Sequence, residues 1–254
     1  MPAPPLTAND LQAALAAIHV SAPVHAEDEL DSTNSRALEL AHAGAPEWTL
    51  VSAAHQTAGR GRDGRAWTDV PGRALMVSVV LRPTIPPPRA GLLSLLAGAS
   101  MARAIRDETG LGVTCKWPND VRLGGAKVGG VLGEALILDE RLAALVIGVG
   151  VNLEAPFDVA DAAGIGDVAP RALLVTFIGH LHDVYSGPDA ELPERVKAAW
   201  LPVADTIGLE VDAIATSGDP LHGRAIGIDG FGGLVISTDD GERTVVFGDI
   251  VHVV

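Results

Sequence analysis

The order of apolar and polar residues along the chain predicts helices and strands that alternate through its first third. Residues 35–44 carry apolar side chains at helical spacing, and Ser32 and Thr33 precede them in the position of N-caps. Apolar runs at 48–54 and 74–81 have the length of buried strands. The polar stretch between these two strands is therefore expected to be a long loop.

The rest of the chain continues this alternation and then changes character. A helix is predicted for residues 88–110, which begin with a proline and end at a glycine. Strand-like runs follow at 112–117, 127–138 and 141–153, and helical stretches at 172–187 and 191–208. Beyond Gly208 come short strands with Asp-Gly turns. We therefore expect an α+β fold, with a mixed sheet and helices on one side in residues 1–207 and a small β-barrel in residues 208–254.

Composition and charge restrict the classes of function. The chain has 254 residues, of which 48% are hydrophobic and 20% charged, as is typical of a globular protein. Its formal net charge of −14 opposes general binding to nucleic acid. The single cysteine, Cys115, allows no internal disulfide and fits a reducing, cytoplasmic setting. The N-terminus predicts a capping box from Thr7 to Asp10 rather than a signal peptide, and no apolar stretch is long enough to predict a membrane span.

The loop between the first two predicted strands contains the segment 59–65, GRGRDGR, which combines three glycines with three arginines. Glycines allow the backbone to come close to a ligand, and guanidinium groups pair with carboxylate and phosphate oxygens. This combination suits a carboxylate that is being joined to a nucleotide phosphate. A flexible solvated loop and an RNA contact are equally compatible with the heptad alone.

Three further motifs contain residues that could act on a phosphate or bind a base. Lys116 and Asp120 flank a proline turn in KWPND, where a lysine could neutralise charge on a phosphate; a surface ion pair is the alternative. Lys127 begins the glycine-containing run KVGGVLGE, which predicts either close approach of a ligand or a β-bulge. Asn152 in GVGVN can donate and accept, as an adenine edge requires, but it also suits a turn.

These motifs occur in a fixed order with Asp31-Ser32-Thr33-Asn34 and Gln56, and the conjunction is more specific than any member. Together they closely resemble the catalytic domain of biotin protein ligases over residues 28–154, with a weaker likeness in the C-terminal β domain. The resemblance implies the mixed-sheet fold of biotin and lipoate ligases followed by an SH3-like barrel. It identifies the chain as a ligase of the monofunctional type.

The resemblance also implies a reaction and a set of site residues. Biotin would be activated with ATP and Mg²⁺ to biotinyl-5′-AMP and then transferred to a lysine of a biotin carboxyl carrier protein. The implied biotin contacts are Ser32, Thr33, Asn34, Gln56, Arg60, Gly61, Arg62, Lys127 and Gly130. The implied nucleotide contacts are Arg60, Arg62, Arg65, Trp67, Lys116, Asn119 and Asn152. Lys116, its partner Asp120 and Arg62 would be catalytic, and Asp120 would help to place Mg²⁺.

One residue departs from the family pattern. The resemblance also carries expectations about binding partners. Asp63 lies where some members carry another basic residue, which would alter closure of the loop. Only 30 residues precede Asp31, too few for the winged helix-turn-helix of the bifunctional repressors, so we expect no DNA binding. The expected partner is the carrier subunit of acetyl-CoA carboxylase, and the chain is expected to be a monomer or homodimer.

Two alternative functions compete with biotin ligation. A lipoate or octanoyl protein ligase would share the α/β architecture, although the spelling of the arginine loop and of KWPND favours biotin. A non-catalytic nucleotide- or RNA-binding module would use the arginine loop, bind RNA with a steep salt dependence and consume no ATP.

Overall fold

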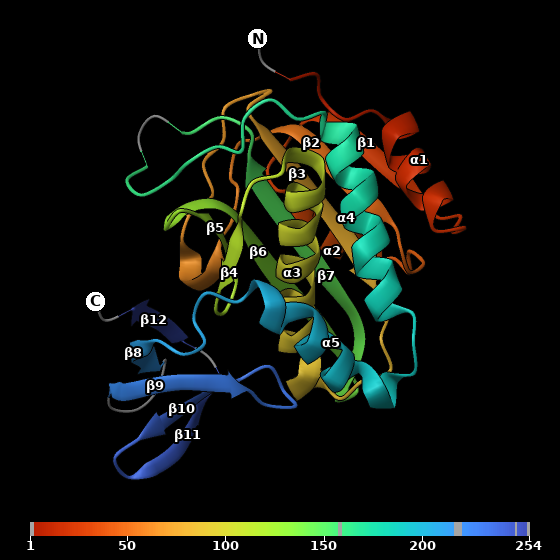
Figure 1. The fold of residues 1–254 in the computed structure, drawn as a ribbon. Coiled ribbons are helices and arrows are strands. Elements are labelled where there is room, and N and C mark those ends of the chain that lie inside the picture. The colour runs from red at the N-terminus through yellow and green to blue at the C-terminus, as the bar shows by residue number, and fades with distance from the viewer. Residues whose placement is uncertain (1–2, 157–158, 216–219, 247, 253–254) are drawn as a thin grey trace.

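A seven-stranded mixed sheet forms the centre of the larger unit (Figure 1). The computed structural model describes residues 3–156, 159–215, 220–246 and 248–252. The strands are β1 (Val24–Leu30), β2 (Leu50–Gln56), β3 (Ala74–Leu81), β4 (Thr114–Lys116), β5 (Asp120–Leu123), β6 (Ala126–Leu138) and β7 (Arg141–Asn152). They are ordered β1-β2-β3-β7-β6-β5-β4; β1 and β2 run parallel, and all other neighbours are antiparallel.

Four helices share one large hydrophobic core with one face of this sheet. They are α1 (Ala8–Ala17), α3 (Ala90–Thr109), α4 (Pro170–Tyr185) and α5 (Leu192–Trp200). The long helix α3 lies across the centre of this face, with α4 beside it (Figure 1). Twelve residues of α3 are buried, so it supplies much of the apolar area that stabilises the fold.

The fifth helix, α2 (Thr33–His42), lies on the opposite face of the sheet. Its buried alanines, Ala37 and Ala41, pack against Val51, Val80 and Val146. The predicted fold class is confirmed, but the expectation of helices on one side is correct only for the other four. α2 can pack on the second face because its buried side chains are small, and its ten residues cover only part of that face.

The predicted helix ends are largely correct, whereas two strands of the large sheet, β1 and the four-residue β5, were missed. Thr7 and Asp10 form the expected capping box, Ser32 caps α2, and Gly110 takes the left-handed conformation after α3. The predicted helix at 191–208 is shorter than expected, because α5 ends at Trp200 and a 3-10 turn containing Pro202 follows. β1 was not predicted, because it carries consecutive acidic residues at an edge of the sheet.

A second sheet of five antiparallel strands forms the C-terminal unit. Its strands are β8 (Glu210–Ala215), β9 (Leu221–Ile228), β10 (Leu234–Thr238), β11 (Gly241–Val245) and β12 (Gly248–His252), in the order β11-β10-β9-β8-β12. This arrangement is consistent with the expected SH3-like unit. Within the described ranges, no helix is both long and apolar enough to cross a membrane.

Buried hydrogen bonds attach the C-terminal unit to the large sheet. Trp117, only 1% exposed, donates from Nε1 to the carbonyl oxygen of Gly232 at 3.0 Å. Its backbone N–H donates to Thr206 Oγ1 at 3.1 Å, just before β8. These two hydrogen bonds therefore fix the KWPND turn against the C-terminal unit and the residues just before it.

Candidate functional site

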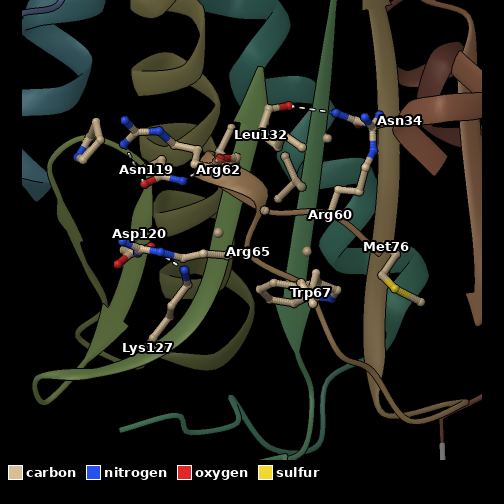
Figure 2. Close-up of a pocket in the computed structure, with 18 of the residues that line it drawn as sticks. Asn34, Arg60, Arg62, Arg65, Trp67, Met76, Asn119, Asp120, Lys127 and Leu132 are labelled. Atoms are coloured by element: carbon tan, nitrogen blue, oxygen red, sulfur yellow. Dashed lines mark hydrogen bonds and ion pairs between the residues drawn. The ribbon is translucent and has the colours of Figure 1, made fainter. Parts of the chain in front are cut away.

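A cavity of about 370 Å³ lies on the sheet face that carries α2. Its floor is made of small residues, since Gly130 of β6 pairs with Gly150 of β7, and Gly148 lies two residues before Gly150. The N-terminus of α2, the turn between β4 and β5, and the arginine loop form its walls. Figure 2 shows side chains from these separate segments turned toward one space.

The cavity collects nearly all the site residues predicted from the sequence. Those that line it are Ser32, Thr33, Asn34, Gln56, Arg60, Gly61, Arg62, Arg65, Trp67, Lys116, Asn119, Asp120, Lys127 and Gly130. Lining residues that were not predicted include Met76, Trp117, Val131, Leu132, Gly148, Val149, Gly150 and Ile250. The individual roles of the predicted residues stay predictions.

The end of the cavity at α2 is polar and ordered by side-chain hydrogen bonds. Gln56 Oε1 accepts from the backbone N–H of Thr33 at 2.7 Å and from its hydroxyl at 3.1 Å. Ser32, Thr33 and Asn34 are each at most 4% exposed. The buried polar groups at this end thus have hydrogen-bond partners within the protein, which hold them in fixed positions.

Asn34 stands at the centre of a hydrogen-bond network that the motifs did not reveal. Its Oδ1 accepts from the Ser78 hydroxyl at 2.6 Å, and its Nδ2 donates to Glu134 Oε2 at 2.8 Å and to the Leu132 carbonyl at 3.1 Å. Gly148 leaves room for it, because a Cβ there would collide with the Asn34 amide. Asn34 therefore uses most of its hydrogen-bonding capacity within the protein.

Sequence reasoning missed Ser78 and Glu134, although each had a signal. Ser78 is the single polar residue in the apolar run ALMVSVVL, and a buried hydroxyl in such a strand requires a hydrogen-bond partner. Glu134 lies four residues after Gly130 in one strand, so strand alternation places both on the same face.

The arginine loop is a short β-hairpin. Arg60 and Ala66 form a β-bridge, Trp67 N donates to the Gly59 carbonyl at 2.9 Å, and a 3-10 turn spans Arg62–Gly64. Asp63 has φ +54°, in the left-handed region that aspartate tolerates better than most residues with a Cβ. The departure at Asp63 thus falls at the tip of the hairpin, in a conformation suited to it.

Three charged groups meet at the other end of the cavity. Lys127 Nζ is 2.5 Å from Asp120 Oδ1, and Lys116 lies directly opposite Asp120 in the β4–β5 pairing. The predicted role of Asp120 as partner of Lys116 stays a prediction, and the structure adds an ion pair between Asp120 and Lys127. Arg62 reaches Asn119 Oδ1 at 3.5 Å, which connects the hairpin to this end.

Trp67 lies against the glycine floor. A Cβ at Gly150 would be 2.7 Å from its indole carbons, and one at Gly130 would be 3.6 Å from the same ring. The indole N–H is buried, and no described residue accepts its hydrogen bond. Gly150 is therefore required by the Trp67 ring, whereas a Cβ at Gly129 would meet the Gly150 carbonyl oxygen.

Asn152 is the predicted residue that lies outside this cavity. It is 6% exposed and donates from Nδ2 to the Ala163 carbonyl at 3.2 Å. It lines an adjoining cavity of about 360 Å³, which shares Trp67, Lys116, Asp120 and Lys127 with the first. Its predicted contact with adenine stays a prediction at this second cavity.

The charge of the site is opposite to that of the protein. Five cationic side chains, Arg60, Arg62, Arg65, Lys116 and Lys127, line the main cavity, while the whole chain has a formal net charge of −14. Cationic groups with low-dielectric walls attract anions such as carboxylates and phosphates. The cavity is therefore suited to a negatively charged ligand.

Metal binding by protein groups alone has little support among the described residues. They include no group of three or more His, Cys, Asp or Glu side chains that could hold an ion. Asp120 is the carboxylate lining the main cavity, and Lys127 already compensates its charge. These donors fit Mg²⁺ only as an ion that keeps its contacts to phosphate oxygens and water, the usual manner in which Mg²⁺ binds with a nucleotide.

Burial keeps two titratable groups near the cavity in their neutral forms. Desolvation raises the pKa of the Cys115 thiol to about 12, which excludes it as a thiolate nucleophile near neutral pH. Desolvation also lowers the pKa of His252 on β12, and the charges of Lys116 and Arg122 act in the same direction. Asp205 opposes this shift.

Comparison with known proteins connects this geometry with a family. Residues 28–152 match the biotin/lipoate A/B protein ligase family, and residues 206–253 match the biotin protein ligase C-terminal domain. The bifunctional ligase/repressor of Bacillus subtilis (strain 168) is 33% identical over 238 residues, covering 88% of this chain and 72% of the relative. The chain belongs to the biotin protein ligase family. The biotin–acetyl-CoA-carboxylase ligase of Mycobacterium tuberculosis is 34% identical, covering 87% of this chain and 85% of that ligase.

A solved member of the ligase family has the same fold. The biotin protein ligase from Aquifex aeolicus in complex with biotin and ATP superposes with a TM-score of 0.71 and 25% identity, covering 91% of this chain and 99% of that one. The family resemblance inferred from the motifs is therefore confirmed, as is the class of enzyme. Of the alternatives, the match at residues 28–152 covers biotin and lipoate ligases alike, whereas the match at 206–253 is to biotin protein ligases.

Proposed function

We propose that this protein activates biotin with ATP to biotinyl-5′-AMP and transfers the biotinyl group to a lysine of a biotin carboxyl carrier protein. The observation that carries the proposal is the convergence of five cationic side chains on one cavity, with a polar end at α2 and a second cavity alongside. The relatives named as biotin ligases support the choice of acid.

The two ends of the cavity suit the two ends of the intermediate. The ureido ring of biotin would lie at the polar end, against Ser32, Thr33 and Gln56, with Gly61 and Gly130 allowing close approach. Lys127 would contact the biotin carboxylate. Nucleotide would extend toward Trp67 and the adjoining cavity, where Asn152 would contact adenine.

The reaction proceeds in two steps. A biotin carboxylate oxygen attacks the α-phosphorus of ATP, and the bond to pyrophosphate breaks. The carrier's lysine amine then attacks the acyl carbon of the mixed anhydride, so that AMP leaves and an amide forms with loss of a proton. Lys116 and Arg62 would stabilise charge on the phosphate in the first step, with Asn119 positioning Arg62.

The remaining elements of the proposal concern ions, partners and domains. Mg²⁺ would enter with ATP, and Asp120 would be its nearest carboxylate; Arg60 and Arg65 would pair with carboxylate and phosphate oxygens. The carrier would be the acetyl-CoA carboxylase subunit, in the cytoplasm, and the ligase would act as a monomer or homodimer without binding DNA. The catalytic domain would be residues 1–207 and the C-terminal domain residues 208–254.

Biotin-dependent exchange of pyrophosphate into ATP tests the first step. We expect exchange with biotin and not with lipoate, and a loss in kcat of on the order of 100-fold or more in Lys116→Ala, because one preorganised charge that stabilises a transition state contributes that much. Lys197→Ala on α5 is the matched control and should exchange like the wild type.

Two results would contradict this proposal. Exchange with lipoate in place of biotin would show the related lipoate ligase activity. No exchange with either acid would contradict acyl adenylation altogether.

A further inference from the structure

A single carboxylate connects the arginine hairpin to the polar end of the cavity. Glu134 Oε2 accepts from Arg60 on the hairpin at 2.8 Å and from Asn34 Nδ2 on α2 at 2.8 Å. Glu134 lies on β6, and its side chain is 24% exposed. One oxygen atom therefore bridges three segments that are far apart in the sequence.

The Glu134 carboxylate lies beside several positively charged side chains. Arg60, Arg62 and Arg65 belong to the hairpin and line the same cavity as Lys116 and Lys127. Two other carboxylates lie near these cations: Asp63 belongs to the turn of the hairpin itself, and Asp120, at the far end of the cavity, is paired with Lys127. Glu134 instead lies beneath the hairpin, where it lines a hollow with residues 58–66. Arg60 lies among side chains of like charge, which repel one another, so loss of its contact with Glu134 favours an open hairpin.

Asn34 gives this carboxylate a fixed position. The Asn34 amide is 3% exposed and is held by Ser78 and by the Leu132 carbonyl. Glu134 is thus oriented by a buried group and, in turn, orients a partly exposed arginine. Hydrogen bonds to charged groups are stronger than neutral ones, which makes this contact effective although Arg60 is 41% exposed.

We propose that Glu134 is a positioning residue that holds the arginine hairpin closed over the cavity before the anionic intermediate forms. The functional part of this inference rests on the proposed function, whereas the contact itself does not. Once an adenylate is bound, its phosphate supplies negative charge to the same arginines. The contribution of Glu134 should therefore be largest in the ligand-free and biotin-bound protein.

Limited trypsin digestion of the ligand-free protein tests the position of the hairpin directly. Cleavage after Arg62 and Arg65 is followed in the wild type, Glu134→Gln, Arg60→Gln and the double variant. We expect each single variant to be cleaved about three-fold to ten-fold faster, and the double variant no faster than the singles, because both changes break one contact. Glu39→Gln, which breaks a surface Arg–Glu pair on α2, should match the wild type.

Kinetic measurements then test whether the position of the hairpin affects the binding of biotin. In the exchange assay, Glu134→Gln should raise KM for biotin by a larger factor than it lowers kcat, and a biotinyl-adenylate analogue should reduce the difference in cleavage.

Wild-type rates of cleavage in Glu134→Gln and Arg60→Gln would overturn the proposal, as would additive effects in the double variant. If Glu134→Gln does not unfold cooperatively, the cleavage rate of Arg60→Gln decides the test, because this variant breaks the same contact at its more exposed partner. Failure of exchange in the wild type would sink the proposed function and leave the cleavage test intact.

Discussion

At the scale of single residues, the site depends on glycines that make room for larger functional neighbours. Gly150 has no positive φ, so its absence of a side chain is explained by Trp67, whose ring would lie 2.7 Å from a Cβ at that position. In Gly150→Ala we expect Trp67 to be displaced and kcat/KM for ATP to fall on the order of 100-fold, because small misplacements in a site have effects of this size. Pyrophosphate exchange at varied ATP concentration measures the change.

Gly227→Ala is the matched control for this prediction. Gly227 lies in β9, and a Cβ there would meet no heavy atom within 4 Å. The control should keep wild-type kinetics. An ATP dependence in Gly150→Ala equal to that of Gly227→Ala would refute the placement of Trp67 on the cavity floor.

Residue-scale prediction from the sequence succeeded where a residue type has its own chemical meaning. Arginines in a glycine-rich loop and lysines beside turns could be recognised, and they do meet in one cavity. Ser78 and Glu134 could not be assigned in the same way, because their importance comes from partners on other strands. Asp120 shows the same limit, since its ion pair with Lys127 joins two different strands and is not encoded in the KWPND motif.

At the scale of elements, α2 carries Ser32, Thr33 and Asn34 into the cavity, and Arg82 holds its C-terminal end. The guanidinium donates to the Ala41 carbonyl at 3.0 Å, to Ala45 at 3.0 Å and to Ala143 of β7 at 2.8 Å. Helix C-termini leave carbonyls without intrahelical partners, so this contact both caps α2 and fixes it to the sheet.

Replacing Arg82 should therefore lower stability. We expect Arg82→Met to reduce the free energy of unfolding by roughly 2–3 kcal/mol, because several partly buried carbonyls lose a charged donor. Urea denaturation measures the difference. Arg36→Met, which removes an exposed ion pair on α2, should cost at most about 0.5 kcal/mol. Equal losses in the two variants would show that Arg82 does not anchor the helix.

Element boundaries were predictable wherever a local signal ends the element. The capping box at Thr7 and the left-handed Gly110 belong to their own helices, so neighbouring residues suffice to place them. The side of the sheet on which α2 packs depends on its tertiary contacts with β2, β3 and β7, and no local pattern encodes it. β1 was missed for a related reason, because a polar edge strand owes its existence to its partner β2.

At the scale of the whole molecule, the C-terminal unit contributes to the main cavity and packs near Lys116. Ile250 of β12 lines the cavity, and Trp117 is anchored to Gly232. His252 of β12 lies 3.4 Å from Thr206 Oγ1, beside the KWPND turn. Because this histidine is partly buried at the junction, we expect its protonation to affect the stability of the fold.

The direction of that sensitivity follows from the two histidines of the C-terminal unit. Burial lowers the pKa of His252, so the unfolded chain binds its proton more readily than the folded protein does. The stability from His252 is complete above its unfolded pKa, about 6.5, and is lost as the pH falls below that value. His222 has the opposite sign, because its hydrogen bond to Asp212 raises its pKa, and its contribution is lost as the pH rises through the folded value.

Thermal unfolding of His252→Gln and His222→Gln between pH 5 and 8 would separate these effects. Relative to the wild type, we expect His252→Gln to gain stability as the pH falls through about 6.5, because it lacks the group whose protonation opposes folding. His222→Gln should lose relative stability over the same interval. Because each variant keeps all carboxylates of the wild type, their titration largely cancels in the comparison. Parallel pH profiles for the two variants would mean that His252 is not desolvated at the junction and that its protonation does not oppose folding.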